Sequence, residues 1–218
     1  MTSEKKKQCL IPAKPASAEI KISNSRFIAN AAPVFSVLQA KRFITTTKQN
    51  YTHASHNVPI FLIGHGTSVI AHSSDDGEPS GTAGRPALTV LQGSGIGDVA
   101  VVITRYFGGT KLGTGGLVRA YSDAVRGVLK VLPLAEKITA YTIKICTPYP
   151  YFDKVRHLID AHGGTIENED FSIEITITCL FRMENFPAFQ SALTELSRGS
   201  IGASIISKNP SATMPLQN

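Results

Sequence analysis

The fold is decided by the stretch from Asp98 to Tyr121, which reads DVAVVITRYFGGTKLGTGGLVRAY. Its first part, Asp98–Arg105, is rich in β-branched residues and predicts a buried strand. Five glycines follow between residues 108 and 116, and apolar residues then recur at helical spacing as far as Leu132. Pro133 cannot continue a helix, so we expect the helix to end there. The pattern predicts a strand–turn–helix unit.

The glycine-rich turn is a candidate anion-binding site. Glycine permits positive φ angles and close approach of a ligand, and a turn that opens a helix directs free N–H groups outward beside the positive end of the helix dipole. The candidate anion- or nucleic-acid-binding residues are Arg85, Arg105, Gly108, Gly109, Lys111, Gly113, Gly115, Gly116 and Arg119. The turn has neither the ending of a Walker loop nor a dinucleotide-binding fingerprint. The alternative is that these glycines only let the turn pack against the sheet.

The helix after the turn carries a polar stripe on the side opposite its apolar residues. Arg119, Asp123, Arg126 and Lys130 fall on this stripe at helical spacing. Two interpretations stay open. In the first, Arg119 and Asp123 pair at i,i+4 on a solvated surface. In the second, the stripe is a basic surface that meets phosphate.

An acidic loop precedes the strand. Residues 73–85 are SSDDGEPSGTAGR, with many turn formers and no periodicity. Carboxylates with a nearby imidazole are suited to acid–base chemistry, so the catalytic candidates are Asp76, Glu78 and His56. The alternative is that Arg85 or Arg105 pairs with these acids and holds the loop. No nucleophile with a matching base stands out, so a binding protein is expected in preference to an enzyme, with no metal or cofactor.

The charge of the chain is unevenly distributed. The 218 residues have a formal net charge of +6. Residues 1–14 hold four lysines and one acid, residues 15–133 hold eleven basic and six acidic residues, and residues 134–218 hold seven basic and nine acidic residues. Polyanion contacts are therefore expected in the first half of the chain.

The chain is expected to be a cytoplasmic protein without a membrane span. Its apolar runs are much shorter than the roughly 20 residues of a transmembrane helix, and Pro12 and Lys14 interrupt the apolar segment that resembles a secretion signal. Three widely spaced cysteines argue against a disulfide framework. We expect Cys146 and Cys179 to lie buried in strands.

The segment pattern predicts an α+β fold with two domains. We expect a polar tail over residues 1–17, a βαβ domain over 18–133, a second domain over 134–208 and a tail over 209–218. In the first domain Pro33 is expected to open a helix. The second domain has the order β-α-β-β-α-β, which is typical of the ferredoxin-like arrangement.

Two segments resemble the signature of the IMPACT family. They are Ser74–Pro86, SDDGEPSGTAGRP, and Val102–Tyr121, VITRYFGGTKLGTGGLVRAY. His56 resembles a further family position, although Val58-Pro59 departs from the commoner cysteine-containing form. The resemblance covers about residues 20–132, and the second domain is similar to the one in bacterial, YigZ-type members.

The resemblance implies a fold and a biological context. The first domain would be similar to domain IV of elongation factor G and the second to its domain V. Eukaryotic members regulate translation by restraining an amino-acid-starvation kinase, but they do so with an additional N-terminal domain, so that role is not carried over. The resemblance supplies no defined activity for bacterial-type members.

We therefore expect a translation-associated regulatory protein that binds RNA or the ribosome through the basic, glycine-rich face of its first domain. Its partners would be the ribosome, RNA or a translation factor. The alternatives are an enzyme acting on a phosphorylated small molecule or nucleotide, and a protein-interaction scaffold without an anion site. The oligomeric state is not predicted.

Overall fold

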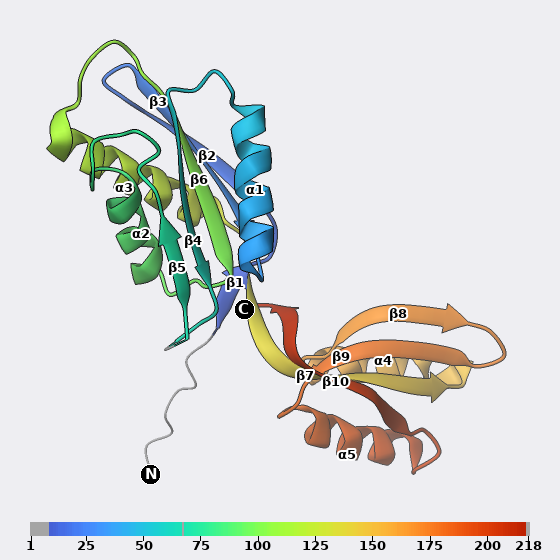
Figure 1. Ribbon diagram of the computed structural model, residues 1–218. Helices are drawn as coiled ribbons and strands as arrows, with labels where there is room; N and C mark the ends of the chain where they lie inside the picture. Colours follow the sequence, from blue (N-terminus) through green and yellow to red (C-terminus); the bar gives the residue numbers. More distant parts are fainter. Residues whose placement is uncertain (1–8, 67, 217–218) are drawn as a thin grey trace. The chain divides into compact units, whose positions relative to one another are not determined.

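The computed structural model describes residues 9–66 and 68–216 (Figure 1). The chain forms two compact units, Met1–Glu136 and Lys137–Asn218. Both contain helices and sheet, so the predicted two-domain α+β fold is confirmed. Among the described residues, none of the helices has the length and apolar character needed to cross a bilayer.

The first unit is built on an antiparallel sheet with the strand order β2-β3-β6-β4-β5. Its strands are β2 (Ala16–Ile22), β3 (Ser25–Pro33), β4 (His56–Ile63), β5 (Ile70–Ser73) and β6 (Val99–Tyr106). The central strand β6 is buried from Val99 to Arg105, as its apolar sequence predicts.

Helices cover both faces of this sheet (Figure 1). Helices α2 (Gly84–Gly93) and α3 (Gly113–Val131) pack on one face, and α1 (Val37–Asn50) packs on the other. Side chains alternate between the faces of a strand. Accordingly Val101 and Ile103 of β6 lie in the core under α2 and α3, whereas Ala100 lies in the smaller core under α1.

The second unit has the predicted ferredoxin-like order of elements. They are β7 (Leu134–Thr147), a 3-10 turn η1 (Tyr149–Tyr151), α4 (Phe152–Ala161), β8 (Thr165–Phe171), β9 (Ile175–Arg182), α5 (Phe186–Ser197) and β10 (Ala203–Pro215). Strand β7 pairs with both β9 and β10, and β9 pairs with β8. This sheet order is that of the split βαβ fold.

Both expected tails contain strands. In the first unit β1 (Leu10–Pro12) pairs with the first residues of β7, and β2 begins at Ala16. At the other end of the chain β10 continues to Pro215, well into the segment expected to be a tail from residue 209. Strand pairing uses backbone groups that every non-proline residue carries, so polar segments without a hydrophobic pattern can join an existing sheet.

Two local predictions were also wrong. Pro33 ends β3, and α1 starts later, at Val37, because the Ser36 side chain accepts a hydrogen bond from the Gln39 N–H (3.2 Å) and caps the helix. Cys146 is exposed, whereas Cys179 is buried as expected, and burial raises the pKa of its thiol to about 12.

Gly108 follows β6 and touches the turn between β2 and β3. A Cβ atom on Gly108 would lie 2.1 Å from the carbonyl carbon of Asn24, and its N–H donates to the Ser25 hydroxyl (3.2 Å). Gly115, in the first turn of α3, has open space where its Cβ would stand. The packing therefore excludes a side chain at Gly108 but leaves room for one at Gly115.

We predict that Gly108→Ala lowers the free energy of unfolding by about 1–3 kcal/mol, because backbone must move to admit the methyl group. The matched variant Gly115→Ala should leave it unchanged or raise it by up to about 1 kcal/mol, since alanine favours a helix over glycine. Urea denaturation of both variants measures the difference. Equal effects would contradict the close packing of Gly108.

Candidate functional site

The acidic loop begins with a carboxylate that organises the backbone around it. The Asp75 side chain accepts hydrogen bonds from the N–H groups of Gly81 (2.8 Å), Ala83 (3.1 Å) and Gly84 (2.8 Å). Partial burial works to raise the pKa of the Asp75 carboxyl, but the three backbone donors outweigh it and hold the pKa below its ordinary value. Asp75 is thereby engaged in forming the loop and the start of α2.

Asp76 is held by contacts with helix α1 and strand β4. Its carboxylate accepts hydrogen bonds from the Lys48 ammonium group (2.5 Å) and from the Asn57 N–H (2.6 Å). Its carbonyl oxygen lies 2.8 Å from Nδ1 of His56, and because a carbonyl can only accept, that nitrogen carries the hydrogen. Asp76 adopts a positive φ of 47°, which places it at a tight turn.

Glu78 is the buried centre of the loop. It is 7% exposed, and its Oε1 accepts hydrogen bonds from Arg105 Nη1 (2.6 Å) and from the Tyr121 hydroxyl (2.8 Å). Its second oxygen, Oε2, lies 3.8 Å from His56 Nε2. Burial and the bond to Glu78 raise the pKa of the Tyr121 hydroxyl, so this group stays protonated and donates.

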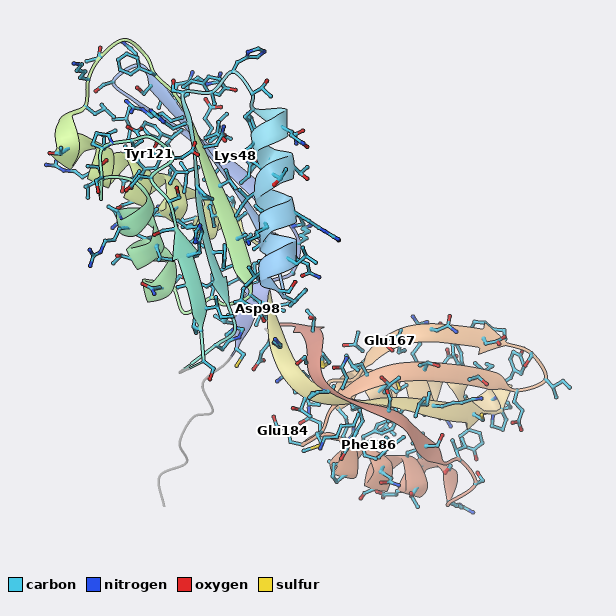
Figure 2. The ribbon with its side chains drawn as sticks, viewed as in Figure 1. Lys48, Asp98, Tyr121, Glu167, Glu184 and Phe186 are labelled. Atoms are coloured by element: carbon cyan, nitrogen blue, oxygen red, sulfur yellow. The ribbon has the colours of Figure 1, made fainter. Side chains whose placement is uncertain are left out.

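The three catalytic candidates His56, Asp76 and Glu78 thus meet in one network, together with Arg105 from β6. Figure 2 marks Lys48 and Tyr121, which border this network from α1 and α3. Both carboxylates are engaged by donors, and the structural interpretation of the sequence, in which Arg105 holds the loop, fits these contacts. Arg85 is exposed and contributes no contact to the acids.

The glycine-rich turn (Gly108–Gly116, called the glycine turn below) leads directly into α3. Gly109 and Gly113 have positive φ values of 86° and 69°. Helix α3 begins at Gly113 without a side-chain cap, and the first-turn residues 113–115 are exposed. Their N–H groups therefore face solvent at the positive end of the helix.

The basic candidates divide into two groups. Lys111 and Arg119 are exposed and make no ion pair within the described part of the chain. Asp123, the possible i,i+4 partner of Arg119, pairs with Arg126 instead (2.7 Å). Arg105, in contrast, is 5% exposed and bound to Glu78, so its guanidinium is not available to an anion from solution. Arg105 must be taken out of the predicted anion-binding set, since strand β6 places its side chain inside the domain.

Six carboxylates among the described residues of the first unit have partners within that unit. The partners are Arg26 for Glu19, backbone N–H groups for Asp75 and Asp98, Lys48 for Asp76, Arg105 for Glu78 and Arg126 for Asp123. The exposed cations left without an ion pair among the described residues are Lys14, Lys21, Lys41, Arg42, Arg85, Lys111, Arg119 and Lys130. The positive charge of this unit that is not offset by an ion pair therefore lies at these exposed cations.

Sequence reasoning missed three members of the network. They are Lys48, Asn57 and Tyr121, which come from α1, β4 and α3. The pairing of His56 with Arg105 and of Asn57 with Thr104 across β4 and β6 places Asn57 there, and strand register is not visible in the spacing of single residues. Lys48 and Tyr121 come from the helices on the two faces of the sheet. Among the described residues, no group of three or more His, Cys, Asp or Glu side chains could hold a metal ion.

The chain is similar to known proteins over most of its length. Residues 23–129 match the Impact N-terminal domain model, and residues 147–200 match a domain of unknown function, DUF1949. The IMPACT family member YigZ of Escherichia coli is 35% identical over 195 residues, which are 88% of this chain and 95% of that protein. The family member YvyE of Bacillus subtilis is 34% identical over 83% of each chain.

A solved structure agrees with the fold. A crystal structure described as that of a hypothetical protein matches with a TM-score of 0.60 and 33% identity, over 92% of this chain and 98% of its own. A structure described as the two-domain translational regulator Yih1 matches with a TM-score of 0.33 and 23% identity over 61% of this chain. At that level the second likeness carries no argument about fold or function.

We predict that Glu78→Gln lowers the free energy of unfolding by about 3 kcal/mol or more, since it leaves the buried Arg105 guanidinium without its counter-charge. The milder variant Tyr121→Phe removes one hydrogen bond and should cost about 1 kcal/mol. Urea denaturation at neutral pH compares the two. A Glu78→Gln variant no less stable than Tyr121→Phe would show that the ion pair does not hold the loop.

Asp75 should make the free energy of unfolding depend on pH in the acidic range. Its folded-state pKa lies below the ordinary value of 3.8, so its contribution is present above pH 3.8 and is lost as the pH falls through the folded-state pKa. Asp75→Asn lacks this titration, and the stability gap between wild type and variant should narrow as the pH is lowered. Denaturation curves recorded from neutral to acidic pH measure the gap. A gap that stays constant would contradict this role.

Proposed function

The chain belongs to the IMPACT family, and from that premise we propose that it is a translation-associated protein that binds RNA through the glycine turn. The contacts would be made by Lys111, by Arg119 and by the N–H groups at the start of α3. Phosphate groups are the ligands that exposed cations and free helix N–H groups recognise.

The observation that carries the proposal is the separation of charges in the first unit. The six carboxylates named above have partners within the domain, whereas Lys111 and Arg119 are exposed, one before and one after the first turn of α3. An exposed cation that pairs with no carboxylate is free to neutralise a phosphate. Arg85, at the start of α2, and Lys130, near the end of α3, add further unpaired positive charge to helices that pack against each other.

The translational context is supported by the architecture. The first domain resembles domain IV of elongation factor G, and the ferredoxin-like second domain resembles domain V of the same factor. The ribosome, RNA or a translation factor are the partners that suit such an arrangement, and all of them belong to the cytoplasm. The unpaired cations give the first domain a surface on which ribosomal phosphates could be bound.

An enzyme acting on a phosphorylated small molecule or nucleotide is the second candidate. The same turn would bind its phosphate, and His56, with its side chain 25% exposed and its Nε2 near Glu78, is the group best placed to exchange protons with a substrate. The engagement of both Asp76 and Glu78 by donors argues against this candidate. Release of product from phosphate esters or nucleotides would favour it over binding alone.

We predict that Lys111→Ala combined with Arg119→Ala weakens RNA binding and lowers the slope of log K against log salt by about 1.4 for single strands or about 1.8 for duplexes. The matched control is Lys41→Ala with Arg42→Ala, which removes the same charge from α1 on the opposite face of the sheet. Fluorescence anisotropy with labelled RNA at several salt concentrations measures both. An unchanged affinity and slope in the first variant, or equal losses in both, would contradict the proposal.

A further inference from the structure

An exposed aromatic side chain stands next to the proposed phosphate contacts. Phe107 follows β6 directly and is 48% exposed. Side chains alternate along a strand, so Phe107 shares the face of Val101, Ile103 and Arg105. That face is the one covered by α3. The ring therefore emerges at the end of the sheet on the same side as the helix that carries Arg119.

The ring of Phe107 is held in place from within the domain. The Arg105 guanidinium carbon lies 5.5 Å from the centroid of Phe107 and 5.4 Å from that of Phe27. This arginine is itself fixed by Glu78. The Phe107 N–H donates to the Ser55 hydroxyl (3.0 Å), so the backbone is restrained as well. A rigid ring of this kind loses little conformational freedom when a flat group stacks on it.

We infer that the RNA bound at this surface is single-stranded, with one unpaired base stacked on Phe107 while its flanking phosphates meet Lys111 and Arg119. The inference rests on the proposed function and names its substrate class. Bases in a duplex are stacked on each other and cannot reach a side chain that lies on the protein surface. A basic surface with an exposed aromatic ring is the combination that single strands recognise.

The spacing of the contacts fits a short single strand. Lys111 lies four residues after Phe107, so their Cα atoms are at most about 14 Å apart. This upper limit corresponds to at most about four nucleotides at about 3.4 Å each. One base and a few phosphates can thus engage the two residues at the same time, which agrees with the smallest site sizes of other single-strand-binding surfaces.

The test compares Phe107→Ala with Phe35→Ala. Phe35 is 49% exposed, and it follows Pro33 at the opposite end of the sheet, because β3 and β6 pair from Arg26–Tyr106 to Pro33–Val99. Labelled oligouridine of about 12 nucleotides and a duplex of the same length are titrated with each variant at two salt concentrations. Phe107→Leu, which keeps apolar bulk but no ring, and Phe107→Trp, which keeps a ring, complete the series. Thermal unfolding verifies that each variant is folded.

We expect wild-type protein to bind the single strand more tightly than the duplex. Phe107→Ala and Phe107→Leu should weaken single-strand binding by about fivefold to a hundredfold at both salt concentrations, with an unchanged salt slope, because stacking releases no counterions. Phe107→Trp and Phe35→Ala should bind as wild type does.

Two results would overturn the inference, and they can be told apart. Equal binding of single strand and duplex, with no loss in Phe107→Ala, would refute base stacking while phosphate binding by the glycine turn still stands. Absence of binding to either RNA by wild-type protein would refute the proposed function and the inference together.

Discussion

The arrangement of the first domain depends on one buried carboxylate, that of Glu78. It accepts hydrogen bonds from Arg105 at the end of β6 and from Tyr121 in α3, so the acidic loop, the central strand and the helix after the glycine turn converge on it. A buried charge is stable only when it is paired and hydrogen-bonded, and Glu78 and Arg105 supply each other's counter-charge through the bond from Nη1 to Oε1. The same arginine then supports the exposed ring of Phe107.

This internal pairing supports the proposed anion-binding surface. Because Asp75, Asp76 and Glu78 are directed into the loop and its neighbours, they do not oppose an approaching phosphate. The motif Ser74–Pro86 is thus better understood as the support of the site than as its chemistry. In the proposed function the contacts with a ligand are made by Lys111 and Arg119, which come before and after the first turn of α3.

Much of the fold, but less of the site, could be predicted from sequence. The buried strand β6, the helix ending before Pro133 and the ferredoxin-like order have strong local patterns of hydrophobicity and turn residues. Strands β1 and the last part of β10 have no such pattern, because they form through pairing with distant strands. For Arg105 the sequence left two interpretations open, an anion contact and an ion pair with the loop acids, and the contact with Glu78 inside the domain favours the ion pair.

The most direct test of the central claim is an NMR titration of the amide N–H resonances of the protein with a short oligouridine. If the glycine turn is the RNA site, the largest shifts will fall on residues 107–119, with little change over α1. Shifts confined to the second domain, or spread evenly over both domains, would show that the glycine turn serves the fold of the first domain and does not bind RNA.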